Sequence, residues 1–387
     1  MWQIFVQFLL LGCVSFGGPA AHIGYFRNHF VERLGWVDGR DFAELLALCQ
    51  FLPGPASSQL GFAIGYRRDG ILGGACAFLG FTLPSVLLML SLAAGGGWLL
   101  EQAWFDSVLH TLKLLALVVV ADALWGMARS FCSGRLTLVI GLFGAIAALL
   151  APGIAAQLAV LVLAAMIGAI MLGRVGKSVQ AGASVPALES ESPGRQRWAL
   201  VLFGCLLALS WLAAESGLAG VAADFYQVGA LVFGGGHVVL PLLQAQLGAD
   251  LAPSQFLLGY AAAQAVPGPM FTLATFLGYE LVSQAPVLGA LLATLVVFLP
   301  GFLVLVAVLP DWQRWVARPA LAGAVAGVNA VVVGLLLAAL YQPVFVSAVT
   351  GGRDLALALV GLYLLRGLGL GVIALVPLAI ITGLLMF

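Results

Sequence analysis

The chain has 387 residues, of which 63% are hydrophobic and 8% are charged, and its mean hydropathy is +1.12. Soluble domains carry roughly 25% charged residues, so this composition excludes an ordinary soluble protein and indicates a polytopic membrane protein. The net charge is zero, which leaves no basic surface to bind nucleic acid.

The first 172 residues contain eight apolar segments that predict helices, four shorter ones followed by four longer ones. The expected ranges are Trp2–Ser15, Ala20–Leu34, Asp41–Leu52, Ala56–Tyr66, Ile71–Trp98, Val108–Ala128, Leu136–Leu150 and Ile154–Leu172. A polar segment rich in Ser, Gly and Pro follows and indicates a linker. A lone apolar helix is then expected over Trp198–Ala214.

The second half of the chain repeats this order of shorter and longer segments. The expected ranges are Phe225–Phe233, His237–Leu247, Ser254–Val266, Met270–Leu281, Pro286–Leu309, Pro319–Leu340, Leu355–Leu365 and Leu368–Phe387. We therefore expect an all-α polytopic membrane protein built from two repeats. The expected divisions are an N-terminal repeat over 1–172, a cytoplasmic linker over 173–197, a connecting transmembrane helix over 198–216 and a C-terminal repeat over 217–387.

One motif is written twice, as Gln50-Phe51-Leu52-Pro53-Gly54-Pro55 and as Gln264-Ala265-Val266-Pro267-Gly268-Pro269. A glycine break precedes each copy, Phe16-Gly17-Gly18 in the first half and Phe233-Gly234-Gly235 in the second. Matching Gly and Pro interruptions in two hydrophobic halves are typical of a secondary transporter whose substrate meets broken helices near the bilayer midplane. The segments beside each Pro-Gly-Pro span only ~18 Å as helices, too short to cross a ~30 Å hydrocarbon core, so we expect re-entrant hairpins.

The charges predict that the two repeats are inverted. Suppose that the arginines before residue 70 are cytoplasmic and that every longer helix crosses the membrane. All basic residues except Lys113 and Arg353 then lie on the cytoplasmic side. Equivalent loops then lie on opposite sides of the membrane: Arg314 and Arg318 are inside, whereas Glu101 and Asp106 are outside. Each repeat crosses the membrane an even number of times, so the single extra crossing by the helix Trp198–Ala214 gives the second repeat the opposite orientation.

A helix that starts inside the membrane exposes unpaired backbone N–H groups and the positive end of its dipole, so it can hold an anion without a lysine or arginine. Four such ends around a pseudo-twofold axis suit a tetrahedral oxyanion. The residues that we expect to bind the substrate are Gly17, Gly18, Gln50, Pro53, Gly54, Pro55, Ser57, Ser58, Gly234, Gly235, Gln264, Pro267, Gly268, Pro269 and Thr272.

Three ionisable residues are candidates for a proton or anion pathway. His22 and His237 follow the glycine breaks closely, and Lys113 lies in a predicted helix. Their alternatives are a structural hydrogen bond for each histidine and, for Lys113, an ammonium group that extends to the membrane surface. The Gly-Pro breaks also have a structural alternative, because such sequences kink helices for packing alone.

The sequence contains no P-loop, HExxH or other catalytic motif, so we expect neither enzyme activity nor a cofactor, and no metal site. A membrane-embedded enzyme would need convergent ionisable residues on crossing helices, and this chain offers few. An anion channel built on the same helix ends is the main alternative to a carrier. The glycine-rich helix faces would allow a homodimer.

Several motifs resemble the chromate ion transporter family over nearly the whole chain apart from the linker. The resemblance rests on Phe16-Gly17-Gly18-Pro19, His22-Ile23-Gly24-Tyr25, Leu52-Pro53-Gly54-Pro55 and Phe81-Thr82-Leu83-Pro84-Ser85, and in the second half on Val232-Phe233-Gly234-Gly235-Gly236, Leu240-Pro241-Leu242 and Thr275-Phe276-Leu277-Gly278-Tyr279. The second copy departs from the first, since Gly236 replaces Pro19 and Met270-Phe271 replaces Ala56-Ser57. The two halves therefore need not contribute equal ligands.

The resemblance implies a multi-pass protein of the bacterial inner membrane that exports chromate, a sulfate-like dianion, and thereby confers chromate resistance. The membrane potential, a proton gradient or both would drive the export. The expected partners are chromate or a sulfate-like oxyanion and the lipid bilayer. Transport of another oxyanion such as sulfate is the alternative.

Overall fold

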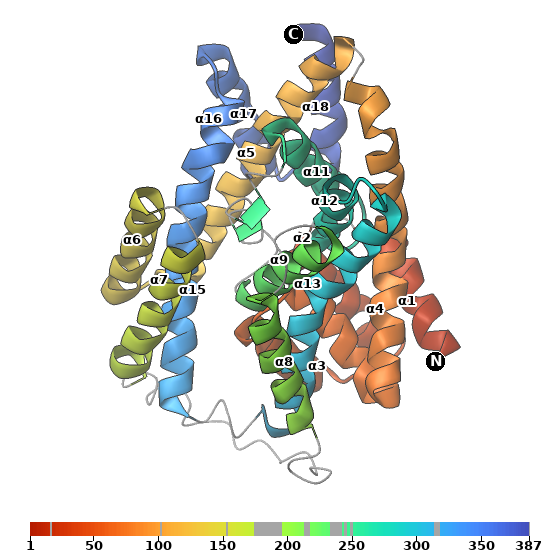
Figure 1. The fold of residues 1–387 in the computed structure, drawn as a ribbon, viewed down its shortest axis with the longest axis vertical. Helices are drawn as coiled ribbons and strands as arrows, with labels where there is room; N and C mark the ends of the chain where they lie inside the picture. Colours follow the sequence, from red (N-terminus) through yellow and green to blue (C-terminus); the bar gives the residue numbers. More distant parts are fainter. Residues whose placement is uncertain are drawn as a thin grey trace.

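The computed structural model describes residues 1–15, 18–100, 103–151, 154–173, 196–212, 217–232, 242–243, 246–247, 251–312 and 318–386. The regular elements in these ranges are all helical, and no strand occurs among them (Figure 1). The all-α fold expected from the composition is confirmed. The linker expected over 173–197 falls almost entirely outside the described residues.

The first half begins with shorter helices and continues with longer ones, as predicted. Its elements are α1 (Trp2–Val14), α2 (Gly18–Phe26) with a π-helical continuation (Arg27–Arg33), α3 (Gly39–Phe51), α4 (Ala56–Leu100), α5 (Ala103–Phe131), α6 (Arg135–Leu150) and α7 (Ile154–Ile167) with a π-helical end (Gly168–Leu172). The side chain of Asp38 caps α3 by accepting a hydrogen bond from the backbone N–H of Asp41.

Helix α4 has an internal break. Its backbone leaves the helical region at Asp69 (φ −153°, ψ 33°) and Gly70 (φ 60°, ψ −152°). A positive φ is costly for any residue with a Cβ, which explains the glycine at this position. α4 therefore consists of two helices, and the prediction of separate segments over Ala56–Tyr66 and Ile71–Trp98 is confirmed to within a few residues.

The second half follows the same order. Its described elements are α8 (Arg197–Ser210), α9 (Gly217–Leu231), α11 (Pro253–Ala265), a 3-10 turn (Met270–Thr272), α12 (Leu273–Leu281), α13 (Pro286–Val308), a second 3-10 turn (Leu309–Asp311), α15 (Pro319–Ala339), a π-helical segment (Leu340–Phe345), α16 (Val346–Ala348), α17 (Gly352–Arg366) and α18 (Val372–Met386). α9 begins eight residues before its predicted start at Phe225, because the apolar pattern was weak over the small residues that open it. Gly217, at φ 73°, marks that start.

Four helical stretches are long and apolar enough to cross a membrane: Ala56–Gly95, His110–Phe131, Pro286–Val308 and Pro319–Gln342. In the first of these, the helix is interrupted at Gly70, so the part after Gly70 is the continuous helix long enough to cross the membrane. Shorter apolar helices occur as well, at Trp2–Val14, Arg135–Leu150, Ala159–Leu172, Trp198–Ser210 and Ala374–Met386. These findings support an integral membrane protein.

Glycines allow the first helix of each half to approach a long helix closely. A Cβ at Gly12 of α1 would lie 2.5 Å from the carbonyl oxygen of Phe81 in α4. In the second half, a Cβ at Gly229 of α9 would collide with the carbonyl oxygen of Val297 in α13. The pairs α1–α4 and α9–α13 thus use the same kind of backbone contact, which small residues permit in membrane helices.

The last two helices of each half pack against a long helix of the other half (Figure 1). α6 and α7 lie along α15, where a Cβ at Gly141 would come within 3.0 Å of the Ala330 carbonyl oxygen. α17 and α18 lie along α5, where a Cβ at Gly383 would come within 2.7 Å of Thr111 Oγ1. The halves are interleaved, so neither half buries all of its helices without the other.

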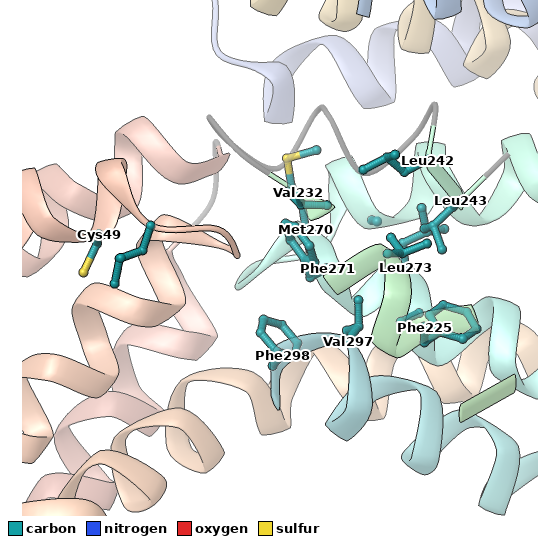
Figure 2. Packing of buried hydrophobic residues seen from close by; sticks show 14 of the residues in the cluster. Cys49, Phe225, Val232, Leu242, Leu243, Met270, Phe271, Leu273, Val297 and Phe298 are labelled. Atoms are coloured by element: carbon teal, nitrogen blue, oxygen red, sulfur yellow. The ribbon is translucent and has the colours of Figure 1, made fainter. Parts of the chain in front are cut away.

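Aromatic side chains join the two halves in the core. The ring of Phe78 in α4 lies 4.9 Å from that of Phe298 in α13, and the rings of Phe62 and Phe302 lie 4.6 Å apart in the same pair of helices. Phe298 also contacts Phe271 at the start of α12, at 5.7 Å between centroids. Figure 2 shows Phe271 and Phe298 among the apolar side chains of the second half.

Candidate functional site

The two Pro-Gly-Pro motifs form sharp loops between helices. The first loop, 53–55, connects α3 to α4, and the second loop, 267–269, connects α11 to the turn that opens α12. The central glycines have positive φ angles, 114° at Gly54 and 102° at Gly268. A side chain at either position would strain the backbone, so the loop geometry requires glycine.

Each loop hydrogen-bonds to the other half of the chain. The backbone N–H of Gly54 donates to the carbonyl oxygen of Val232 (2.6 Å), and the backbone N–H of Gly268 donates to that of Ser15 (2.8 Å). Ser15 and Val232 occupy equivalent positions, directly before the Phe-Gly-Gly of each half. The loop of one half therefore meets the end of the first helix of the other half.

A second pair of contacts repeats this exchange. A Cβ at Gly54 would lie 2.9 Å from the Cα of Gly301 in α13, and a Cβ at Gly268 would lie 2.7 Å from the Oγ of Ser85 in α4. Gly301 and Ser85 each follow the proline inside their helix. The two loops thus occupy equivalent places against the two halves.

His22 of α2 is fully buried beside the second loop. Its Nε2 lies 3.1 Å from the Ser15 carbonyl oxygen, and its Nδ1 lies 3.3 Å from the Oγ of Ser57. The carbonyl can only accept, so Nε2 carries a proton, and in the neutral ring Nδ1 accepts from the Ser57 hydroxyl. The ring stands edge-on to Phe81, with centroids 5.2 Å apart.

The predicted polar ligands differ in their hydrogen bonds. Ser57 is engaged by His22, and the hydroxyl of Thr272 donates to the Pro269 carbonyl oxygen (2.8 Å). By contrast, the buried Oγ of Ser58 and Nε2 of Gln264 have no hydrogen-bond partner among the described residues. Ser58 and Gln264 therefore hold donors that a ligand could use.

The two predicted glutamines also differ, and a third one was missed. Gln50 is exposed, whereas Gln264 is buried. It is Gln59, on the first turn of α4, that supports the first loop, because its Nε2 donates to the carbonyl oxygens of Pro53 (2.7 Å) and Gly301 (3.0 Å). The sequence feature that could have identified Gln59 is its place one helical turn after the first loop. The equivalent position in the second half holds Leu273, so the repeat did not draw attention to it.

Several predicted site residues lie outside the described part of the chain: Gly17, Gly234, Gly235 and His237. Gly18 is the first residue of α2. The donors that the described residues bring to the loops are backbone N–H groups, hydroxyls, amides and one imidazole. In the described ranges no group of three or more His, Cys, Asp or Glu residues could hold a metal ion.

Comparison with known proteins identifies the family. The family model described as chromate transporter matches residues 2–171 and, a second time, residues 219–385. The chain belongs to the chromate transporter family. It is a two-copy member, because both halves match the same model.

Three curated relatives have similar lengths to this chain. A chromate transport protein of Cupriavidus metallidurans is 29% identical over 87% of this chain and 81% of its own. A probable chromate transport protein of Synechococcus elongatus is 30% identical (87% and 83%), and a chromate transport protein of Pseudomonas aeruginosa is 28% identical (86% and 79%). No solved structure matches the chain.

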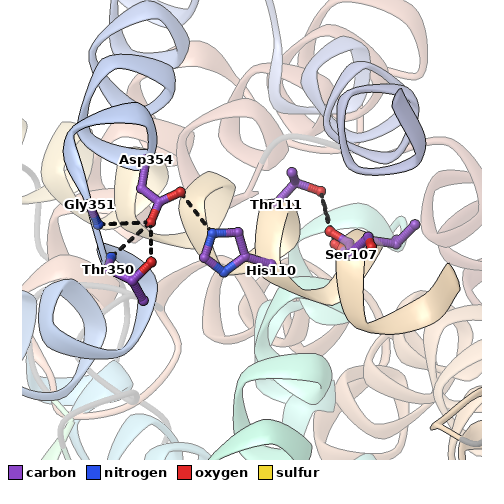
Figure 3. A network of polar contacts seen from close by, with 7 residues as sticks. Ser107, His110, Thr111, Thr350, Gly351 and Asp354 are labelled. Atoms are coloured by element: carbon purple, nitrogen blue, oxygen red, sulfur yellow. Dashed lines mark hydrogen bonds and ion pairs between the residues drawn. The ribbon is translucent and has the colours of Figure 1, made fainter. Parts of the chain in front are cut away.

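Away from the loops, this member of the family has a second polar cluster between its halves (Figure 3). His110 of α5 contacts Asp354 of α17, with Nε2 and Oδ1 2.9 Å apart. The other carboxylate oxygen of Asp354 accepts from the Thr350 N–H (2.8 Å), the Thr350 hydroxyl (2.7 Å) and the Gly351 N–H (3.2 Å). Asp354 thus caps α17 and links it to α5.

The predicted pathway residue Lys113 lies on α5, one turn after His110, and is partly buried. Asp122 on the same helix pairs with Arg366 of α17 (2.7 Å). Glu280 is partly buried in α12. There its Oε2 accepts a hydrogen bond from Gln255 (2.9 Å).

Proposed function

We propose that this chain is a secondary transporter that exports chromate across the bacterial inner membrane, with its substrate site where the Pro-Gly-Pro loops meet the opposite half. The observation that carries this proposal is the pair of exchanged hydrogen bonds, Gly54 to Val232 and Gly268 to Ser15. These bonds bring the loops and the ends of the first helices together. The chromate transport proteins among the relatives support chromate as the substrate.

The chemistry of the loops supports an anion. α4 starts directly after the first loop, and a 3-10 turn that opens α12 follows the second; a helix start offers unpaired backbone N–H groups and the positive end of the helix dipole. A hydroxyl donor at Ser58 and an amide donor at Gln264 lie close to the loops, and neither has a hydrogen-bond partner among the described residues. Neutral donors of this kind can replace the hydration of an oxyanion without a lysine or arginine, whose charge would make release slower.

We further propose that the two repeats are inverted in the membrane and that the helices beside the loops are re-entrant. The strong inward bias of the basic residues supports the inversion. The equivalent glycine contacts of α1 with α4 and of α9 with α13 support a common repeat. α3, α11 and α12 have 13, 13 and 9 residues, which supports hairpins that enter partway, since a full crossing needs about 20.

The membrane potential is sufficient to drive this export. Moving a dianion out of a cell that is negative inside releases about 4.6 kcal/mol per 100 mV, enough for a gradient of roughly a thousandfold. Proton coupling is a further proposal, motivated by His22. Protonation would make Nδ1 a donor, so Ser57 would accept from His22 and its own hydroxyl proton would become available to the anion.

The test is chromate flux in proteoliposomes that contain the purified chain, with an imposed potential and with sulfate as competitor. We expect saturable, potential-driven chromate movement, and counterflow that identifies a carrier rather than a channel. Replacing Pro53-Gly54-Pro55 with three alanines is expected to abolish the flux. Pro377→Ala in α18, which also removes a proline from an apolar helix, is the control and is expected to keep it.

Each outcome bears on a different part of the proposal. Flux of sulfate without flux of chromate would replace the substrate and keep the architecture. Conduction without counterflow would favour the channel. Absence of flux for every anion tested would refute the transport function, and a chromate flux that ignores an imposed pH gradient would remove the proton coupling.

A further inference from the structure

The two loops have equivalent backbone contacts but different chemical surroundings. We call the contact of Gly268 with Ser15 the Ser15 crossing and the contact of Gly54 with Val232 the Val232 crossing. Val232 is a fully buried member of the hydrophobic core (Figure 2). The Ser15 crossing, in contrast, adjoins the imidazole of His22.

Hydroxyl groups at the Ser15 crossing have no counterpart at the Val232 crossing. Ser15 corresponds to Val232, because each precedes the Phe-Gly-Gly of its half. Pro84 in α4 and Pro300 in α13 are taken as equivalent. Counted from these prolines, Thr82 corresponds to Phe298 and Ser85 corresponds to Gly301. The repeat therefore keeps its backbone design in both halves but keeps these polar side chains in only one.

Buried donors without a partner gather beside the Ser15 crossing. Among the described residues, no hydrogen-bond partner is present for the Oγ of Ser15, the Oγ of Ser58, the Oγ1 of Thr82 or the Nε2 of Gln264, and all four residues are at least nine-tenths buried. Leaving such a donor unsatisfied costs about 1–3 kcal/mol. Four of them in segments that meet near the two loops indicate a place where a ligand supplies the acceptors.

Contacts of the same or neighbouring residues bring the segments that carry these donors together. Gly268 meets both Ser15 and Ser85, and the hydroxyl of Ser85 donates to the Thr82 carbonyl oxygen (2.9 Å). Ser58 follows Ser57, which contacts His22, and Gln264 lies one helical turn before Gly268. Ser15 and Gln264 thus adjoin the second loop, Thr82 lies on the helix that contacts it, and Ser58 lies at the start of α4, next to the residue that contacts His22.

At the Val232 crossing, the amide donor that the described residues place against the loop is already engaged. The Nε2 of Gln59 already donates to two carbonyl oxygens, those of Pro53 and Gly301. Its Oε1 is a buried acceptor without a partner in the described part of the chain. An unpaired acceptor repels an oxyanion, so this crossing is better suited to structural support than to binding.

We propose that the transported oxyanion binds at the Ser15 crossing alone, held by the hydroxyls of Ser15, Ser58 and Thr82 and by the amide of Gln264. This inference rests on the proposed function and adds the residues that bind the anion, two of which, Ser15 and Thr82, are not among the ligands expected from the sequence. The four donors match the four oxygens of a tetrahedral dianion such as chromate or sulfate. The Val232 crossing holds the two halves together.

The test uses the full chain in proteoliposomes, with chromate and then sulfate as the transported probe. Thr82→Val removes a hydroxyl and keeps the shape of the side chain, and Ser15→Ala is an independent second variant. Each is expected to raise KM about tenfold with little change in maximal rate, since each removes one hydrogen bond to a charged group. Thr82→Ser, which restores the hydroxyl, is expected to recover a KM near that of the wild type.

Thr294→Val is the matched control, because it also removes a buried threonine hydroxyl, here one bonded to Thr275 in the second half. It is expected to leave KM unchanged. An unchanged KM in both Thr82→Val and Ser15→Ala would overturn the one-sided site while wild-type flux upholds the proposed function. Absence of flux in the wild type would refute both, and equal KM changes in Thr82→Val and Thr294→Val would show a structural effect only.

Discussion

Single glycines carry the geometry of the loops. Gly268 combines a φ of 102° with a close approach to Ser85, where an added Cβ would lie 2.7 Å from Oγ. Gly54 repeats this combination against Gly301. The conformation excludes L side chains, and the neighbouring helix occupies the space that a Cβ would need.

The residue-scale prediction concerns Gly268. Gly268→Ala is expected to cost about 1–3 kcal/mol of stability, because alanine would be strained at a positive φ and would press on Ser85. Thermal unfolding of the purified protein in detergent should show a lower Tm. Gly24→Ala, in α2 with open space around it, is the control and should melt like the wild type; an equal Tm for both variants would contradict the strain argument.

At the scale of elements, hydrogen bonds between polar side chains fix how α17 packs against α5. Asp354 is buried at the start of α17, where it accepts three hydrogen bonds from Thr350 and Gly351 and faces His110 of α5 (Figure 3). One side chain thereby caps a helix and connects it to the other half. A buried carboxylate is tolerated here because all of its bonds are made within the protein.

The element-scale prediction is that Asp354→Ala lowers stability by about 2–4 kcal/mol, since it removes both the cap and the contact with His110. Thermal unfolding in detergent would measure this as a lower Tm. Arg353→Ala, at the exposed neighbouring residue, is expected to have little effect. A wild-type Tm for Asp354→Ala would show that the cluster contributes nothing to the packing of α17 on α5.

At the scale of the whole molecule, the halves are interleaved. α6 and α7 lie along α15, and α17 and α18 lie along α5, so each half completes the packing of the other. Close glycine contacts such as that of Gly141 with Ala330 hold these helices together. The exchange of helices parallels the exchange of hydrogen bonds at the loops.

The whole-molecule prediction concerns the inverted repeats. Arg135 at the start of α6 and Arg353 near the start of α17 are exposed residues in equivalent positions, and inversion puts them on opposite sides of the membrane. In a background with Cys13, Cys76 and Cys205 replaced by serine, Arg353→Cys is expected to react with an impermeant thiol reagent added to intact cells. Arg135→Cys is expected to react only after the membrane is opened. Equal labelling of both from outside would contradict the inversion.

The sequence by itself determined the class of protein, the helix order and the family. Low charge and long apolar runs leave the bilayer as the only solvent for such a chain, and helices satisfy their backbone groups within each segment. The sequence predicted interruptions at both Pro-Gly-Pro motifs and between Tyr66 and Ile71, and the glycines at these places, Gly54, Gly268 and Gly70, have positive φ angles. The doubled motif likewise indicated two related halves, and the family model matches both.

Only the tertiary structure decided which groups meet. The bonds of Gly54 with Val232 and of Gly268 with Ser15 join residues far apart in the chain. Nothing local distinguishes an exposed Gln50 from a buried Gln264, or marks Ser15 as the acceptor for His22. Long-range packing places these side chains, since the burial and hydrogen bonds of a helix face depend on the neighbours that the fold brings to it.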